Sequence, residues 1–217
     1  PKSVGGVTVN RYCASGITAV AMAADRIRVG QAEVMIAAGA ESMSMVPMMG
    51  YHPSMNMGIF KDENIGMAYG MGLTAEKVAQ QWKISREAQD EFSLKSHQKA
   101  IAAQLAGEFN DETTAVDIVE RFPNLASGKI DIKTRSVSQD EGARADTNLA
   151  SLARLRPVFA PKGSVTAGNS SQMSDGAGAS ILVSERVLKE LNLTPLARWV
   201  GFAVGGVPPE IMGIGPV

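Results

Sequence analysis

A chain of 217 residues, with 45% hydrophobic and 20% charged residues, is long enough for one sizeable core and has the composition of a globular protein. Its formal net charge of −1 gives no electrostatic reason to expect a nucleic acid or a membrane surface as a partner. A single cysteine excludes an intrachain disulfide and fits a reducing compartment, and no apolar run approaches the roughly 20 residues of a membrane helix.

The only cysteine, Cys13, lies where a short β-branched segment meets a helical one. Residues 4–9 predict a strand, and the small and apolar residues at 14–29, before Gly30, predict a buried helix. We therefore expect Cys13 at the positive end of a helix dipole, beside backbone N–H groups without a partner inside the helix. This position stabilises a thiolate, and the N–H groups can hold an oxyanion after attack on a carbonyl. By position alone, Cys13 can also be a small core residue.

An apolar run at residues 33–39 predicts a second buried strand. With the strand at 4–9 and the helix between them, it makes a strand–helix–strand unit with a right-handed crossover. Neither strand alternates with polar residues, so helices are expected to cover both faces of the sheet.

Methionine is concentrated in the next segment, because residues 43–71 hold eight of the twelve methionines among glycines and prolines. Methionine is flexible and polarizable, so this segment can adapt to a greasy ligand. It can equally be a loop that packs over the core, and the composition favours neither reading.

Two helices are predicted after this segment. Thr74 can cap a helix at 75–83, and Ser85 can cap a second helix at 86–106. Most charged residues of the chain lie in and around these helices, between residues 61 and 162, which predicts an exposed insert between two apolar segments.

The last third of the chain returns to apolar segments. These predict, in order, a buried strand at 179–184, a linking helix at 185–193 and a further strand at 196–204.

Five motifs follow one another along the chain. They are Asn-Arg-Tyr-Cys-Ala-Ser-Gly at 10–16, Ala-Gly-Ala-Glu-Ser-Met-Ser at 38–44, Met-Gly-Leu-Thr-Ala-Glu at 71–76, Val-Thr-Ala-Gly-Asn-Ser-Ser at 165–171 with Asp-Gly-Ala at 175–177, and Met-Gly-Ile-Gly-Pro at 212–216. In their order and spacing, the chain closely resembles the thiolases over nearly its whole length.

The resemblance implies an α/β fold with a thiolase-like layered αβα core and an inserted α-rich loop domain. It assigns residues 1–41 to the first core domain, which carries the nucleophile, and residues 42–163 to the loop domain, which binds coenzyme A. Residues 164–192 return to the first core domain, and residues 193–217 begin a second core domain.

The resemblance also implies the activity of an acetyl-CoA C-acyltransferase, with Cys13 as the catalytic nucleophile. The Cys13 thiolate would attack the 3-keto carbon of a 3-ketoacyl-CoA, release acetyl-CoA and pass the acyl group to a second coenzyme A. Coenzyme A enters as a substrate, and no metal or tightly bound organic cofactor is implied.

Five further residues are assigned to substrate binding by the resemblance alone. Arg144 would lie near the adenine, Ser151 near the adenosine part and Ser171 near the thioester end of the pantetheine. Met71 and Gly70 would line the acyl and pantetheine pocket. By residue type, Arg144 can also be one charge in a polar turn, and Ser171 a capping residue.

Two positions distinguish types of thiolase. Biosynthetic acetoacetyl-CoA thiolases often carry His at the place of Gly70 and Gln at the place of Arg11, so the chain resembles the degradative 3-ketoacyl-CoA thiolases more closely. The biosynthetic type remains the alternative. A non-catalytic thiolase-like lipid or acyl-CoA carrier is the alternative of another class, against which the intact Cys13 motif argues. A decarboxylating ketoacyl synthase of related fold is a further alternative, but the long methionine-rich and charged insert resembles that of thiolases better.

Three further thiolase motifs, Gly-His-Pro, Cys-Ile-Gly-Gly and Asn-Glu-Ala-Phe, do not occur in the sequence. The two histidines, His52 and His97, have the surroundings of surface or loop residues. We therefore expect an internal fragment that has no thiolytic turnover alone. The intact enzyme is expected to form a dimer or tetramer. Its expected compartment is the cytoplasm in a bacterium, and the peroxisome or mitochondrial matrix in a eukaryote.

Overall fold

The computed structural model describes residues 2–217, which form two compact units. The first unit comprises the chain up to Met55 together with Met173–Gly206. The second unit comprises Asn56–Gln172 together with Val207–Val217. None of the helices in the described part of the chain is long and apolar enough to cross a membrane.

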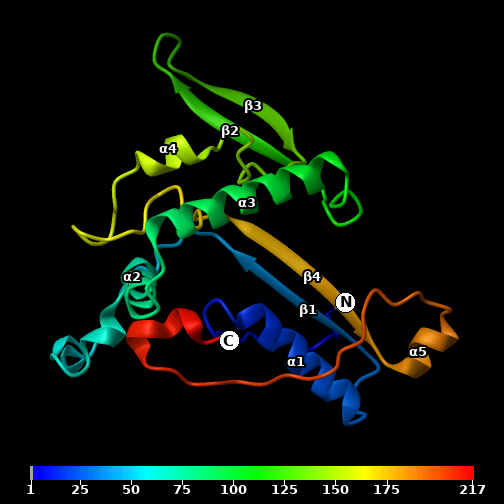
Figure 1. The fold of residues 1–217 in the computed structure, drawn as a ribbon. Helices are drawn as coiled ribbons and strands as arrows, with labels where there is room; N and C mark the ends of the chain where they lie inside the picture. The colour runs from blue at the N-terminus through cyan, green and yellow to red at the C-terminus, as the bar shows by residue number, and fades with distance from the viewer. Residues whose placement is uncertain (1) are drawn as a thin grey trace. The chain divides into compact units, whose positions relative to one another are not determined.

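The first unit is built around a two-stranded antiparallel sheet (Figure 1). Strand β1 (Val34–Glu41) pairs with β4 (Gly176–Val183) along its whole length, so that Val34 lies opposite Val183 and Glu41 lies opposite Gly176. Just beyond the end of β1, the backbone N–H of Ser44 donates to Asp175 Oδ1 at 2.8 Å, and its hydroxyl donates to the other carboxylate oxygen. These hydrogen bonds hold the pKa of Asp175 below its usual range.

Helix α1 (Ser15–Arg28) packs on one face of this sheet. Its predicted bounds are confirmed to within a residue, and it ends before Gly30, whose φ of 73° is open to glycine without strain. The contact face is made of small side chains, because Ala37 of β1 and Ala21, Ala23 and Ala24 of α1 are buried.

The expectation that helices cover both faces of the sheet is wrong for the described residues. Side chains alternate between the two faces of a strand, and the cross-strand pair Ile36 and Ile181 is 68% and 70% exposed on the face opposite Ala37. The prediction of a fully buried α1 is also wrong, since Ile17 and Met22 are exposed.

Two predicted strands are absent from the described structure. Residues 4–9 and residues 196–204 have no regular secondary structure. The physical reason is the same for both: a strand needs a neighbour to pair its backbone groups, and no described strand lies beside either segment. The predicted crossover unit is therefore wrong, and the partner of β1 is the antiparallel β4.

The C-terminal part of the first unit is held by side chains instead. Arg28 Nη2 of α1 donates to Val200 O at 2.7 Å, which fixes the irregular segment that was predicted to be a strand. Helix α5 (Glu185–Glu190) follows β4 directly and is capped by Ser184, whose hydroxyl accepts from Val187 N at 3.2 Å.

The second unit contains most of the helices. They are η1 (Met57–Phe60), η2 (Ile65–Ala68), α2 (Met71–Gln81), α3 (Arg86–Leu105), α4 (Leu149–Ala153) and η3 (Pro209–Ile214). Helix α2 packs against η3, which comes from the far end of the chain, and α3 packs against α4.

One predicted cap is confirmed and one is wrong. Ser85 caps α3, because its hydroxyl accepts from Ala88 N at 3.2 Å. Thr74 lies inside α2, is buried, and donates its hydroxyl to Met71 O at 2.8 Å. Helix α2 begins earlier than predicted because Gly70 has an extended backbone and its carbonyl accepts from the N–H groups of Leu73 and Thr74.

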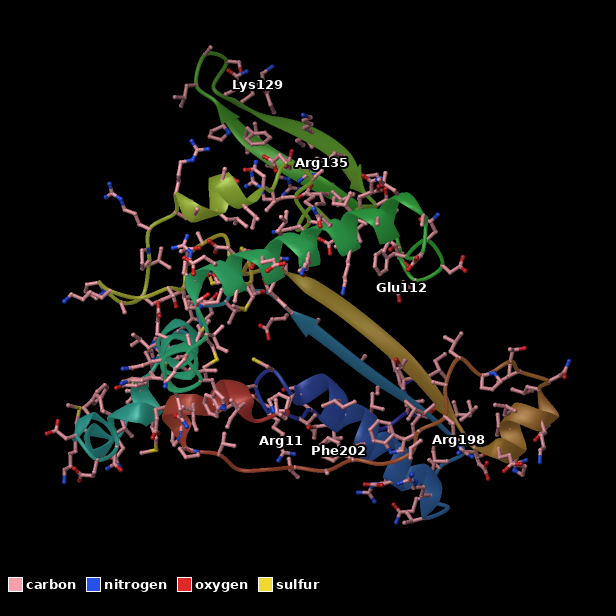
Figure 2. All side chains as sticks on the ribbon, in the orientation of Figure 1. Arg11, Glu112, Lys129, Arg135, Arg198 and Phe202 are labelled. Carbon is pink, nitrogen blue, oxygen red and sulfur yellow. The ribbon has the colours of Figure 1, made fainter. Side chains whose placement is uncertain are left out.

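A β-hairpin also interrupts the predicted α-rich insert. Strand β2 (Val116–Asn124) pairs with β3 (Lys129–Val137) in antiparallel register. Arg135 Nε donates to Glu120 Oε1 at 3.2 Å across the two strands, and Lys129 lies at the turn end (Figure 2). The sequence analysis missed this hairpin because its charged residues were read as part of a solvated insert.

Candidate active site

Cys13 is exposed in a tight turn that leads into α1. Asn10 Oδ1 accepts from Tyr12 N at 3.0 Å. The hydroxyl of Ser15 accepts from Arg11 N at 2.8 Å and donates to Tyr12 O at 2.7 Å. Both sides of the turn are therefore tied to the residues that flank Cys13.

Tyr12 carries the conformational cost of this turn. Its φ of 49° lies in the left-handed region, where a side chain other than glycine costs about 1–2 kcal/mol. Tyr12 is 89% exposed, so burial of its ring does not offset this cost within the described structure. The hydrogen bonds from Asn10 and Ser15 maintain the strained residue and place Cys13 directly before the first turn of α1.

The first turn of α1 offers free backbone donors next to Cys13. The N–H of Ala14 donates to Arg11 O, and that of Ser15 donates to Tyr12 O, both at 3.0 Å. No acceptor among the described residues meets the N–H groups of Gly16 and Ile17. These groups form the positive end of the helix, which stabilises a thiolate or an oxyanion.

Arg11, two residues before Cys13, lies beside an aromatic pair of the same unit (Figure 2). Its guanidinium carbon is 6.0 Å from the ring centroid of Phe202, within the range of a cation–π interaction. Phe202 in turn stacks on Trp199, with ring centroids 6.5 Å apart. This contact connects the turn of Cys13 with the segment near the end of the first unit.

The residues predicted to bind coenzyme A all belong to the second unit. Arg144 forms a two-pronged ion pair with Asp146, with Nε–Oδ1 at 3.2 Å and Nη2–Oδ2 at 3.0 Å. This hydrogen-bonded pair raises the pKa of Arg144 and lowers that of Asp146. The backbone N–H of Arg144 donates to His97 Nδ1 at 3.1 Å. A groove of about 250 Å³ lies beside Arg144, lined by Leu94, Ile101 and Leu105 of α3.

Ser151 lies three residues after the N-cap of α4 and forms a capping box with Asn148. Asn148 Oδ1 accepts from Ser151 N at 2.9 Å, and the Ser151 hydroxyl donates to Asn148 O at 2.8 Å. Asn148 Nδ2 also donates to Asp146 O at 3.3 Å. The structure therefore brings Arg144 and Ser151 together in one hydrogen-bonded segment.

Ser171 and the two pocket residues lie elsewhere in the second unit. Ser171 is exposed, and its hydroxyl donates to Gln172 O at 3.1 Å. Met71 is 49% exposed at the start of α2. A Cβ added at Gly70 would meet no atom within 4 Å, so the space beside this residue is open. No hydrogen bond connects Ser171, Met71 or Gly70 with the segment of Arg144 and Ser151 directly.

Sequence reasoning missed a group of hydrogen-bonded polar residues around the turn that leads to Ser171. Glu76 accepts from the backbone N–H groups of Ser164 and Val165, each at 2.9 Å. Asp90 is 3% exposed and accepts from Asn169. Glu76 and Asn169 stood in motifs that marked the resemblance, but nothing in their spacing showed that they act on one turn. Within residues 2–217, no group of three or more His, Cys, Asp or Glu side chains is placed to hold a metal ion.

The comparison with protein families decides which family this fold and turn belong to. The family described as "Thiolase, N-terminal domain" matches residues 1–186. The chain belongs to the thiolase family. Its cysteine turn, the sheet of β1 and β4 and the helices α1 to α4 therefore form part of a thiolase N-terminal domain, and its α/β architecture is that of a thiolase.

Similar thiolases come from several sources. A 3-ketoacyl-CoA thiolase of Bacillus subtilis is 45% identical over 218 residues, which cover 100% of this chain and 55% of that protein. The crystal structure of the dimeric peroxisomal thiolase of Saccharomyces cerevisiae matches with a TM-score of 0.80 and 40% identity, over 96% of this chain and 51% of the other. The crystal structure of human mitochondrial 3-ketoacyl-CoA thiolase in complex with CoA matches with a TM-score of 0.79 and 38% identity, over 99% of this chain and 54% of the other. The chain thus spans about half the length of these relatives.

Proposed function

We propose that the protein containing this chain transfers acyl groups between coenzyme A thioesters, with Cys13 as the nucleophile. The observation that carries the proposal is the exposed Cys13 in a strained turn, directly before the free N–H groups of Gly16 and Ile17. The names of the similar thiolases, which include 3-ketoacyl-CoA thiolases, support the same reaction.

The proposed reaction has two steps at Cys13. The thiolate attacks the 3-keto carbon of a 3-ketoacyl-CoA, and the oxyanion that forms is stabilised by hydrogen-bond donors. The C2–C3 bond then breaks, the enolate of acetyl-CoA takes up a proton and leaves, and the shortened acyl group remains on sulfur. The thiol of a second coenzyme A attacks this thioester and releases the acyl-CoA and the Cys13 thiolate. The condensation is the same sequence in reverse.

We propose that coenzyme A binds along the second unit. Arg144 and Ser151 would meet its adenosine end, and Ser171 would meet the pantetheine near the thioester. The support is the hydrogen-bonded segment that connects Ser151 with Arg144, together with the groove on α3 that Arg144 lines. The open space at Gly70 supports acceptance of longer acyl chains, which is the degradative type of activity.

We also propose self-association, as a dimer or a tetramer, and no cofactor beyond coenzyme A as substrate. The dimeric yeast thiolase supports an oligomer. The similar proteins come from a bacterium, a peroxisome and a mitochondrion, which supports a cytoplasmic location in a bacterium and either organelle in a eukaryote. Light scattering on the purified complete protein measures the number of subunits.

The test of the reaction is thiolysis by the complete protein, with acetoacetyl-CoA and a longer 3-ketoacyl-CoA as alternative substrates. Mass spectrometry after mixing with acyl-CoA should show an acyl adduct on the peptide that contains Cys13. Cys13→Ser should remove both the adduct and the turnover while circular dichroism stays unchanged. Wild-type turnover in Cys13→Ser would refute the proposal, and turnover of acetoacetyl-CoA alone would point to the biosynthetic type.

A further inference from the structure

Asp90 is a buried carboxylate on α3 whose one oxygen orients Arg86 of the same helix and whose other oxygen binds Asn169 of a distant turn. It is 3% exposed. Its Oδ2 accepts from Arg86 Nε at 2.8 Å, and its Oδ1 accepts from Asn169 Nδ2 at 2.9 Å. A buried charge is stable only when its oxygens find donors, and here each oxygen has a donor from a different segment.

The Arg86 side connects Asp90 with α4, the helix that carries Ser151. Arg86 Nη2 donates to Leu152 O at 2.6 Å and to Leu155 O at 3.1 Å. These carbonyls lie at and just beyond the C-terminal end of α4, and Leu152 O also accepts from the backbone N–H of Leu155 at 3.0 Å. Arg86 therefore fixes α4 from its C-terminal end.

The Asn169 side connects Asp90 with the turn that leads to Ser171. Asn169 Nδ2 also donates to Ser164 O at 3.0 Å, and its Oδ1 accepts from Thr166 N at 2.7 Å. Thr166 is fully buried. The side chain of Asn169 thus closes the turn over residues 164–169, two residues before Ser171.

The two segments also touch directly. A Cβ added at Gly168 would lie 2.5 Å from Leu155 Cδ1 and 2.6 Å from Leu152 Cδ2, so any larger residue would displace the leucine side chains that pack on the turn. The contact at Gly168 joins the same two segments that Asp90 links, through Asn169 on one side and through Arg86 of its own helix on the other.

We infer that Asp90 is a positioning residue for coenzyme A, because its carboxylate fixes the helix of Ser151 relative to the turn of Ser171. The inference rests on the proposed function, in which these two serines contact different parts of one extended ligand. Such a ligand requires that the spacing between its contacts is maintained, and loss of that spacing weakens binding without removing any contact group.

Asp90→Asn tests this role with little change in volume. The new amide has one oxygen and one NH2 group, so its NH2 group must face a donor, either Arg86 Nε–H or the Asn169 amide. We expect the Kd for coenzyme A, measured by calorimetry on the complete protein, to rise on the order of tenfold or more. Gly168→Ala separates the same segments by steric contact and should weaken binding in the same direction.

Asn169→Asp brings two carboxylates together and should also weaken binding. The double variant Asp90→Asn with Asn169→Asp restores a donor–acceptor pair between the two positions and keeps an acceptor for Arg86. It should bind coenzyme A several-fold more tightly than Asn169→Asp, because both of these variants lose the donor to Ser164 O and differ only in the pair with position 90. Ser85→Ala is the control, because it removes the cap of the same helix and leaves both sides of Asp90 intact.

The outcomes separate this inference from the proposed function. The positioning role would be overturned if Asp90→Asn bound coenzyme A with unchanged affinity. It would also be overturned if Asp90→Asn bound no more weakly than Ser85→Ala at a similar loss in Tm, or if the double variant bound no more tightly than Asn169→Asp. A wild-type protein that does not bind coenzyme A would overturn the proposed function and this inference with it. The rate of Cys13 alkylation by iodoacetamide should be the same in all variants, since Asp90 and both of its hydrogen-bond partners belong to the second unit.

Discussion

Replacement of Ser151 and Asn148 separates a ligand contact from a helix cap at the start of α4. Asn148→Ala removes the oxygen that accepts from Ser151 N at 2.9 Å, a loss of about 1 kcal/mol in the free energy of unfolding. Ser151→Ala removes a hydroxyl that donates at 2.8 Å and accepts at 3.4 Å, a net loss of about 0.5–1 kcal/mol. If both residues act only as caps, Asn148→Ala should lower the free energy of unfolding at least as much as Ser151→Ala.

Binding of coenzyme A should reverse this order. If the hydroxyl of Ser151 contacts the adenosine part, its loss costs about one further hydrogen bond, which is about a fivefold rise in Kd. Its hydrogen is directed to Asn148 O, so the hydroxyl offers coenzyme A an acceptor. Urea unfolding gives the stabilities, and calorimetry gives the Kd values. A Kd that rises as much in Asn148→Ala as in Ser151→Ala would refute a direct contact.

Three further predictions concern Cys13, Arg144 and Gly70. Acyl-CoA should protect Cys13 from iodoacetamide when the complete protein is digested and mapped, and equal labelling with and without acyl-CoA would argue against an acyl-enzyme. Arg144→Ala should raise the KM for coenzyme A more than it lowers kcat, whereas Asp146→Asn frees the guanidinium for a phosphate and should lower that KM several-fold. Arg144 lowers the pKa of Asp146, so the ion pair is present above that pKa and is lost only as the pH falls through it. The difference in the KM for coenzyme A between Asp146→Asn and wild type should therefore stay constant from about pH 8 to pH 5. Gly70→His fills open space and should reduce kcat/KM for a long 3-ketoacyl-CoA more than for acetoacetyl-CoA, and an equal reduction would remove Gly70 from the acyl pocket.

The sequence was informative where structure depends on neighbours along the chain. The helix after Cys13 followed from a run of small residues that stops at Gly30, and Ser85 predicted the start of α3 from its capping hydroxyl. The positive φ of Tyr12 could not be predicted, because it depends on the hydrogen bonds of Asn10 and Ser15 across the turn.

Features that depend on distant residues were the ones missed. A strand at residues 4–9 was predicted from its side chains, but strand formation also needs a neighbouring strand, which side-chain composition does not reveal. Asp90, four residues after Arg86, has the spacing of a solvated helix ion pair. Only Asn169, 79 residues away in the sequence, explains why the carboxylate of Asp90 is buried. The motifs therefore revealed the family and gave Cys13 as the candidate nucleophile, whereas the hydrogen bonds around Ser151 and Ser171 required the fold.

The pairing of β1 with β4 has a consequence for how this protein can evolve. The chain leaves β1 at Glu41 and returns at Gly176 directly opposite, and Ser44 and Asp175 are hydrogen-bonded just beyond the strand ends. The segment between them, about 130 residues long, is thus a very long hairpin connection. The entropy of closing such a connection grows only with the logarithm of its length, so doubling it costs about 0.6 kcal/mol. Insertions and deletions can accumulate between the two strands while the sheet beneath the helix of Cys13 keeps its register.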